Sequence, residues 1–518
     1  MAENGESAAA IGFSMARMHE PARLSRLDAR VCARARLTRD ARFDGLFFIA
    51  VTSTGIYCRP VCPAPSPKEC NVRYYDSAAA AAAAGFRPCL RCRPEAAPGS
   101  PLHRARSELV AGALRLIEQG ALDAGSMPEL AARVGVGERH LRRVFAEELG
   151  ASPQDVAATR RLLFAKQLLT ETALPVAQVA EAAGYASLRR FNAAFLAAYG
   201  RPPRVLRRVR AGARRAARPF DPDIRMTASA SITLRLPYRA PYDFAHLLAF
   251  YARRMIPGVE AVDERGYRRT FVVDGEPGWF AVSPLDGEAA LALDVHHPRS
   301  SALGAIAARV RRMFDVDADP RALAAAFRRS ELLGPLIRRW PGQRLPGAWD
   351  GFELAVRAVL GQQVSVAAAR TLAARVAAAH GTPFAGGAAE GLTALFPTPA
   401  RLADAPLETL GITRARASTI RGLAHAVLEG RVQFRAEQPL AAFERDLVAL
   451  PGIGPWTAHY IAMRALAQPD AFPAADLILR RAAGAPQGRT LATRELEQLS
   501  EAWRPWRAYA VMLLWRAS

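Results

Sequence analysis

Four cysteines near the start of the sequence have the spacing of a metal site. Cys58 and Cys62 form a C-x₃-C pair, and Cys89 and Cys92 form a C-x₂-C pair. Such spacing can bring four thiolates to one tetrahedral zinc ion. A zinc-bound thiolate can also act as a nucleophile, so the pattern fits either a structural zinc knot or a reactive centre. Arginines lie among the two pairs and would attract a polyanion toward the metal: Arg59, Arg87, Arg91 and Arg93.

A single carboxylate, Asp476, follows a glycine-containing turn far along the sequence. The turn lies in the segment LPGIGPWTA (450–458), where Gly452 and Gly454 would let the backbone approach a phosphate closely. The helix predicted after the turn would offer free N–H groups to the same phosphate. Asp476 itself lies among apolar residues in AFPAADLILRR, where a fixed carboxylate could stabilise positive charge that develops on a bound group. A helix N-cap is the alternative role for this aspartate.

Composition narrows the classes of function. The 518 residues include 70 basic and 48 acidic side chains, a net charge of +22. This excess favours nucleic acid as a partner, with an acidic membrane surface second. No run reaches the ~18 apolar residues of a membrane span, and no basic leader precedes an apolar core, so we expect no secretory signal. Reduced thiols on a metal fit the cytoplasm better than disulfides, which leaves Cys32 and Cys70 as ordinary thiols.

Hydrophobic periodicity places these groups on a multidomain chain that is mainly α, with α+β parts. Over residues 102–210 apolar residues recur at three- and four-residue spacings, and two short-helix pairs break at Gly135 and Gly184. A basic helix follows each break, which is typical of a helix-turn-helix. Alternating apolar residues from Ile232 predict strands, and from Ser301 the pattern is helical. The predicted boundaries are a disordered tail over 1–25, a zinc domain over 26–98, a helix-turn-helix domain over 102–212, a linker over 213–229, an α+β subdomain over 230–305 and a helical domain over 306–518.

The first two domains resemble known families. Residues 26–93 resemble the N-terminal domain of the bacterial adaptive-response protein Ada, through FDGLFFIAVTSTGIYCRPVCP, NVRYY and GFRPCLRCRP, and residues 104–210 resemble the DNA-binding domain of AraC-type regulators. The Ada resemblance implies that the four cysteines bind one zinc ion and that Cys58 accepts a methyl group from a methylphosphotriester in DNA. It also implies DNA contacts by Thr54, Arg59 and Arg87. Methylation would remove one negative charge at the metal and raise DNA affinity.

Ada proteins commonly carry a further domain that removes alkyl groups from guanine through an acceptor cysteine. No cysteine follows Cys92 in this sequence, so that reaction is not expected.

Residues 232–515 resemble the inducible 3-methyladenine DNA glycosylase AlkA, through the LPGIGPWTA helix-hairpin-helix, RLPGAWDGFELAVRAVLGQQVSV and WRPWRAYAVMLLW. The resemblance implies that Asp476 is catalytic and that Gly452, Gly454 and Thr457 bind DNA. Trp456 and Trp515 would stack on the damaged base, and Gln363 would fill the gap left by the flipped nucleotide. Trp456 stands where strand-nicking relatives place a lysine, so base removal without strand cleavage is expected. Tyr242 and Trp279 are assigned to the core or the cleft wall.

Together these resemblances imply a bifunctional alkylation-response protein with one Zn²⁺ per chain. Its expected partners are double-stranded DNA, both alkylated and promoter, and RNA polymerase; no membrane partner is expected. A monomer in the bacterial cytoplasm, associated with the nucleoid, is the expected state. Two alternatives stay open at this point: a transcription regulator whose C-terminal half only binds DNA, and a structural zinc domain that senses nothing.

Overall fold

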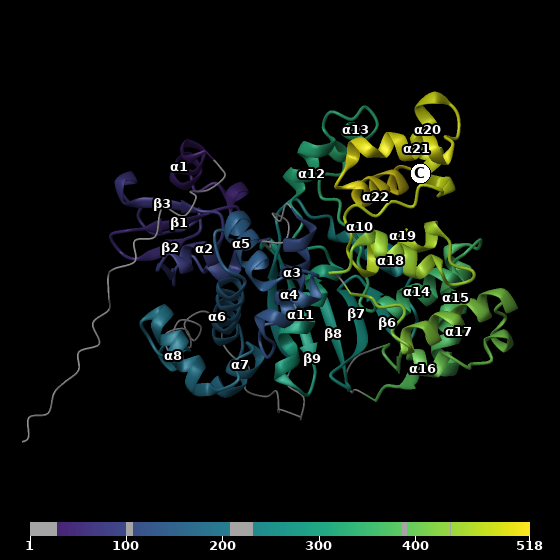
Figure 1. Cartoon of the computed structure of the whole chain (residues 1–518), viewed down its shortest axis with the longest axis horizontal. Helices are drawn as coiled ribbons and strands as arrows, with labels where there is room; N and C mark the ends of the chain where they lie inside the picture. Colours follow the sequence, from purple (N-terminus) through teal and green to yellow (C-terminus); the bar gives the residue numbers. More distant parts are fainter. Residues whose placement is uncertain (1–27, 100–106, 208–230, 386–390, 436) are drawn as a thin grey trace, which may run out of the picture.

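The computed structural model describes residues 28–99, 107–207, 231–385, 391–435 and 437–518. We call 28–99 the N-terminal region, 107–207 the middle region and 231–518 the C-terminal half, and Figure 1 draws them in purple, in blue, and in teal to yellow. The predicted tail over 1–25 and the predicted linker over 213–229 lie outside the described residues. Among the described residues, no helix combines the length and apolar character needed to cross a membrane.

The N-terminal region is a small sheet buried on both faces. Its strand order is β3-β1-β2-β4, with β1 Phe48–Val51, β2 Ile56–Cys58, β3 Val72–Tyr75 and β4 Arg87–Pro88. Side chains alternate along β1, so Ile49 packs in one cluster with Cys32 of α1 (Ala29–Leu37), whereas Ala50 packs in another with α2 (Ala78–Ala83). Because both faces are covered, β1 is apolar throughout. Cys32 is therefore a buried core thiol, and Cys70 is exposed.

The middle region contains the two predicted helix-turn-helix units. Gly135 and Gly184 lie at the turns with φ of +76° and +80°, a left-handed backbone that glycine adopts without steric cost. Ser126 starts the first unit with a capping box to Glu129, which satisfies the free N–H groups at that helix end. The helices are α3 (Glu108–Glu118), α4 (Met127–Arg133), α5 (Glu138–Leu149), α6 (Pro153–Glu171), α7 (Val176–Ala182) and α8 (Leu188–Tyr199).

The two helix-turn-helix units belong to different hydrophobic cores. Leu141 and Phe145 of α5 pack in a cluster with residues of α3 and α4 and with Ala79 of α2. Phe191 and Phe195 of α8 belong instead to the large cluster that fills the C-terminal half. The second unit touches both neighbouring parts of the chain, since α7 lies against residues 300–302 and α8 lies against β4.

The C-terminal half begins with an antiparallel sheet of order β5-β9-β8-β7-β6. Leu234 and Leu236 of β5 are buried as the alternation predicted. β5 is an edge strand, and α6 satisfies part of that edge: the Arg235 amide donates to Glu171 at 3.1 Å, and its carbonyl accepts from Gln167 at 2.9 Å. The strands are β5 (Ile232–Pro237), β6 (Glu260–Asp263), β7 (Gly266–Val273), β8 (Glu276–Pro284) and β9 (Ala290–His296), with α10 (Phe244–Ala252) after β5.

Helices make up most of the remainder, as predicted, although a short ladder of β10 (Thr382–Pro383) and β11 (Ala394–Leu395) interrupts them. One continuous hydrophobic core joins the sheet to these helices, so the core does not mark the domain boundary predicted at residue 305. This boundary and the other predicted domain boundaries stay predictions. The helices are α11 (Leu303–Met313), α12 (Pro320–Phe327), α13 (Leu333–Arg339), α14 (Gly351–Leu360), α15 (Val366–His380), α16 (Pro399–Leu402), α17 (Arg414–Leu428), α18 (Leu440–Val448), α19 (Pro455–Ala465), α20 (Leu477–Gly484), α21 (Thr493–Ser500) and α22 (Arg507–Ala517).

Candidate active site and metal centre

The four predicted metal ligands lie together in the N-terminal region. The sulfur atoms of Cys58, Cys62, Cys89 and Cys92 all lie within 4.8 Å of one another. The sheet explains this proximity: β2 and β4 run parallel, Tyr57 lies opposite Pro88, and the Cys89 amide donates to the Tyr57 carbonyl at 3.0 Å. Each strand therefore delivers its cysteine pair at the same end of the sheet.

The donor set fits zinc. Four sulfur ligands at mutual contact distance match a tetrahedral thiolate site. Backbone amides support the sulfurs, since Arg59 N–H donates to Cys92 Sγ at 3.3 Å and Arg91 N–H to Cys89 Sγ at 3.4 Å.

The three predicted DNA contacts around this centre differ in their surroundings. Thr54 and Arg87 are exposed at the surface of the N-terminal region. Arg59 is half-buried, and its guanidinium forms an ion pair with Asp44 and donates to the Cys92 carbonyl at 3.0 Å. The Arg59 side chain therefore holds the second cysteine pair in place, and its predicted DNA contact stays a prediction.

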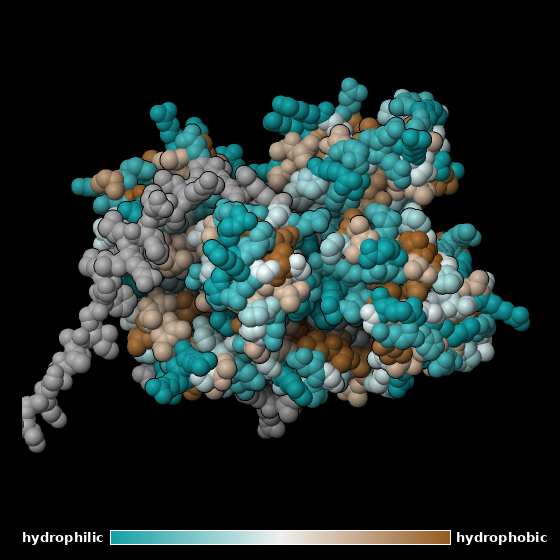
Figure 2. All heavy atoms as spheres, in the orientation of Figure 1, coloured by the Kyte–Doolittle hydropathy of each residue, from teal (hydrophilic) through white to brown (hydrophobic). Residues whose placement is uncertain are grey.

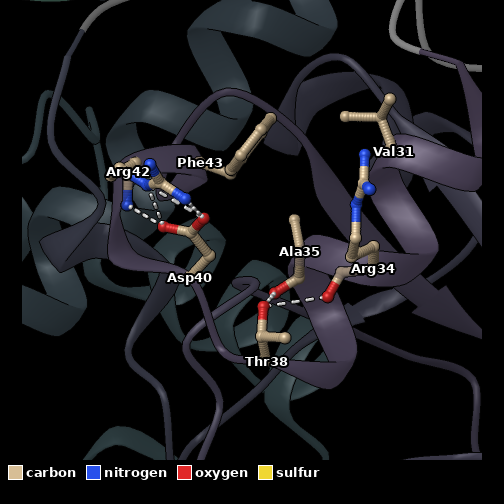
Figure 3. A pocket seen from close by; sticks show the side chains of 7 residues that line it. All are labelled: Val31, Arg34, Ala35, Thr38, Asp40, Arg42 and Phe43. Carbon is tan, nitrogen blue, oxygen red and sulfur yellow. Dashed lines mark hydrogen bonds and ion pairs between the residues drawn. The ribbon is translucent and has the colours of Figure 1, made fainter.

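A cavity of about 600 Å³ lies elsewhere in the N-terminal region, against α1 and the turn after it. Figure 3 shows its lining side chains, among which Asp40 forms an ion pair with Arg42 at 2.7 Å. The Asp40 carboxylate is thus held by the arginine beside it. Its lining residues are Val31, Arg34, Ala35, Thr38, Asp40, Arg42 and Phe43.

The second candidate site is centred on Asp476 in the C-terminal half. The residue is the N-cap of α20, where Oδ1 accepts the Leu479 amide at 2.9 Å. Two predicted base-binding residues contact the same carboxylate: Trp456 Nε1 donates to Oδ2 at 3.0 Å and Trp515 Nε1 to Oδ1 at 3.2 Å. The structure therefore brings Asp476 and both tryptophans together. The N-cap interpretation and the proximity to the tryptophans hold at the same time.

Tyr460 is a residue of this site that the sequence analysis did not single out. It lies one helical turn after Trp456 on α19, and the two rings stack with centroids 5.5 Å apart and an interplanar angle of 6°. Its ring also lies 6.3 Å from that of Trp515, and its hydroxyl accepts from Arg464 at 2.7 Å. Burial would raise the pKa of Tyr460, but the neighbouring Arg464 and Arg254 outweigh burial and lower it. The four-residue spacing from Trp456 was the available signal.

The hairpin leads into α19, which carries Trp456. Gly452 has φ of +87°, and an added Cβ would lie 2.1 Å from the Thr419 hydroxyl. Gly454 is exposed, and a Cβ added there would have no neighbouring atom within 4 Å. Thr457 is buried, and its hydroxyl accepts from Gln362 at 3.2 Å. Gln363 is exposed on the loop between α14 and α15.

Of the two aromatic residues assigned to the core or cleft wall, Tyr242 packs on the core with its hydroxyl donating to the Phe314 carbonyl. Trp279 stacks on His296 across β8 and β9, with centroids 3.8 Å apart.

Four family models match the chain in succession. They are the metal binding domain of Ada over 31–95, a helix-turn-helix domain over 130–209, the AlkA N-terminal domain over 233–350 and the HhH-GPD superfamily of base excision DNA repair proteins over 356–507. These matches define a class: a DNA repair protein that joins a metal-binding module, a helix-turn-helix module and a glycosylase fold.

Similar proteins narrow this class. A probable bifunctional transcriptional activator/DNA repair enzyme AlkA from Mycobacterium tuberculosis is 42% identical over 93% of this chain and 95% of its own length. The chain belongs to this family. DNA-3-methyladenine glycosylase 2 of Escherichia coli is 34% identical over 54% of this chain and 95% of its own length. The Escherichia coli bifunctional activator/repair enzyme Ada is 41% identical over 23% of this chain and 32% of its own length.

The predicted family resemblances and fold class are thereby confirmed. The match to the Ada metal-binding domain, together with the four clustered cysteines, also confirms one zinc ion per chain as the cofactor.

Proposed function

We propose that the C-terminal half removes alkylated bases of the 3-methyladenine type from duplex DNA and leaves an abasic site. The observation that carries this proposal is the Asp476 carboxylate, held by two indole N–H groups and one backbone amide. As the base departs with the electrons of the N-glycosidic bond, the sugar becomes positively charged, and a carboxylate in fixed orientation stabilises it. Oδ2 accepts one of these hydrogen bonds, so its second lone pair can orient the attacking water. Trp456 offers no amine for a Schiff base, so the strand stays intact.

The aromatic side chains support selection of the base by charge. The rings of Trp456, Tyr460 and Trp515 adjoin one another beside the carboxylate. An alkylated purine carries positive charge, and a cation over an aromatic face gains about 0.5–2 kcal/mol, depending on desolvation. An ordinary base lacks this attraction, so the site would retain damaged bases preferentially.

We propose that the N-terminal region accepts a methyl group on Cys58. Cys89 and Cys92 are buried, whereas Cys58 and Cys62 are half-buried, and of these two Cys58 follows the exposed Thr54 turn. The Cys58 sulfur would form a bond to the methyl carbon as the carbon–oxygen bond of the phosphotriester breaks, which releases an ordinary phosphodiester. Zinc, when bound, would keep the sulfur deprotonated at neutral pH. The loss of one negative charge would then favour DNA binding.

The regulatory part of the proposal concerns promoter DNA. The exposed face of α5 carries Arg139, His140, Arg142 and Arg143, basic side chains that suit contacts with DNA along the major groove. Arg142 and Arg143 pair with Glu138 and Glu147 on the same helix, and DNA would have to compete with these pairs. Figure 2 shows hydrophilic residues over much of the visible face, with hydrophobic residues between them. RNA polymerase as a partner rests on the activator function named for the relatives. A monomeric state and a nucleoid-associated cytoplasmic location complete the proposal.

Two variants of the full chain test the proposal. Asp476→Asn keeps an N-cap residue but removes the charge and sets an amide donor against the Trp456 or Trp515 indole N–H. Opposite charges about 4 Å apart attract by about 4 kcal/mol at an effective dielectric constant of about 20. Base release should therefore fall about 10³-fold, since each 1.4 kcal/mol changes the rate tenfold. Methyl transfer should continue unchanged.

Cys58→Ser should show the opposite pattern, with base release retained and methyl transfer lost. If Asp476→Asn releases 3-methyladenine at the parental rate, the catalytic assignment is wrong. If the parent protein itself only binds alkylated duplex, the C-terminal half is a DNA-binding module.

A further inference from the structure

The loop between α14 and α15 is fastened to the hairpin by one side chain. Gln362 is half-buried, and its carboxamide nitrogen donates to the Gly452 carbonyl at 2.9 Å and to the Thr457 hydroxyl at 3.2 Å. Gly452 lies in the turn of the hairpin, and Thr457 lies in the first turn of α19. A single amide therefore joins the loop to both parts of the hairpin motif.

A third element, α17, secures the same junction. Arg416 on α17 donates to the backbone carbonyl of Gln362, so both the main chain and the side chain of this residue are held. One turn later, the Thr419 hydroxyl bonds to the Pro451 carbonyl at 3.1 Å. Loop, hairpin and α17 thus form one hydrogen-bonded unit.

The neighbouring Gln363 has a backbone conformation that this unit must maintain. Its φ is +54°, in the left-handed region, which costs a non-glycine residue on the order of 1 kcal/mol. Gln363 is exposed, and so are Val364, Ser365 and Val366 after it. Because Gln362 is held at its side chain and its carbonyl, the loop cannot relax away from this conformation.

We propose that Gln362 is a positioning residue that sets the distance between the phosphate-binding hairpin and the Gln363 loop. The two would then engage the duplex as one rigid clamp, in which the hairpin binds the backbone while Gln363 enters the gap beside it. This inference rests on the proposed glycosylase function. It assigns Gln362 no contact with the base or the sugar.

Gln362→Leu in the full chain tests the proposal, because leucine keeps the volume of the side chain and removes its donor. The single-turnover rate of base release at saturating protein should fall about tenfold, because both hydrogen bonds that hold the loop against the hairpin are lost. A 2-aminopurine placed beside the lesion brightens when it is unstacked. With Gln362→Leu most of this fluorescence increase should be lost, because Gln363 no longer enters the gap beside that base. Binding to an undamaged duplex should weaken less than twofold.

A matched control is Gln433→Leu. Gln433 is also half-buried and donates to a glycine carbonyl, that of Gly430, at 3.0 Å, but it lies away from the hairpin at the far end of α17. This variant should match the parent in both readouts.

A double-mutant cycle with Thr457→Val measures the same contact from its other side. The valine side chain lacks the hydroxyl acceptor, so the effects of the two substitutions should overlap and the double variant should be little worse than Gln362→Leu. Fully additive effects, or a Gln362→Leu protein with parental rate and parental 2-aminopurine signal, would overturn the positioning role. If the parent releases no base at all, the proposed function has failed instead.

Discussion

Gly452 and Gly454 are two residues apart in one hairpin, yet a methyl group added to each should have different consequences. At Gly452 the backbone is left-handed, and the new Cβ would lie 2.1 Å from the buried Thr419 hydroxyl. The strained φ costs about 1 kcal/mol. Displacing a hydroxyl that bonds to the Ala415 and Pro451 carbonyls adds about 1–3 kcal/mol. Gly452→Ala should therefore destabilise the C-terminal half by about 2–4 kcal/mol.

Gly454 is the matched position. Its φ is −98°, no atom lies within 4 Å of the added Cβ, and the only expected cost is the poorer N-cap propensity of alanine, about 1 kcal/mol or less. The methyl group would nevertheless stand where a DNA phosphate must approach the backbone. Gly454→Ala should keep its stability and lose about tenfold in affinity for a duplex containing an abasic site.

Tryptophan fluorescence suits this comparison, because all seven tryptophans of the chain lie in the C-terminal half, between Trp279 and Trp515. Thermal unfolding followed by this signal reports stability, and fluorescence anisotropy of labelled duplex reports affinity. Thr419→Ala should restore part of the stability lost in Gly452→Ala, since it removes the clashing hydroxyl. Equal destabilisation by the two glycine substitutions, or no restoration by Thr419→Ala, would refute the reasoning.

Two further predictions concern buried charges. Burial raises the pKa of Asp315 to about 7, so the stability that this side chain contributes is full below the unfolded pKa near 3.8 and is lost as pH rises through about 7. The melting temperature followed by tryptophan fluorescence should therefore fall from pH 5 to pH 8. Asp315→Asn should make this pH dependence flatter, and an unchanged pH dependence would contradict the assignment. The Lys166 and Glu95 side chains form an ion pair at 2.7 Å, and each is 2% exposed. Lys166→Met should cost about 1–3 kcal/mol, because the buried Glu95 carboxylate then keeps only Arg93, at 3.2 Å, as its ionic partner. Adding Glu95→Gln should recover part of that loss in melting curves by circular dichroism, and a double variant no more stable than the single one would count against this.

Most of the features that could be predicted from the sequence depend on the spacing of residues that lie close together in it. Cys58, Cys62, Cys89 and Cys92 cluster as their spacing indicated, because a thiolate site requires little beyond two pairs and a sheet that aligns them. The turns at Gly135 and Gly184 were equally visible, since both need a left-handed backbone that few residues other than glycine adopt.

The periodicity of apolar residues could not predict which elements pack against one another. An apolar stripe on α8 predicts burial but does not say against what: the Phe191 ring contacts Tyr185 and Phe195 of its own unit, in a cluster that continues into the C-terminal half. Gln362 gave no signal, because its role depends on Gly452, 90 residues further along the chain. Tyr460 shares the Trp456 side of α19, but a single aromatic at this spacing is equally typical of a core residue.

The most direct test of the account follows both reactions in one preparation of the zinc-loaded full chain incubated with excess methylated duplex DNA. A cysteine that accepts a methyl group irreversibly reacts once, whereas a carboxylate that only orients charge is regenerated after each cleavage. Peptide mass spectrometry should show one added methyl group on Cys58 that reaches a plateau, while release of 3-methyladenine continues over many turnovers. Methyl groups on other residues, or base release that stops at one equivalent of protein, would contradict the account.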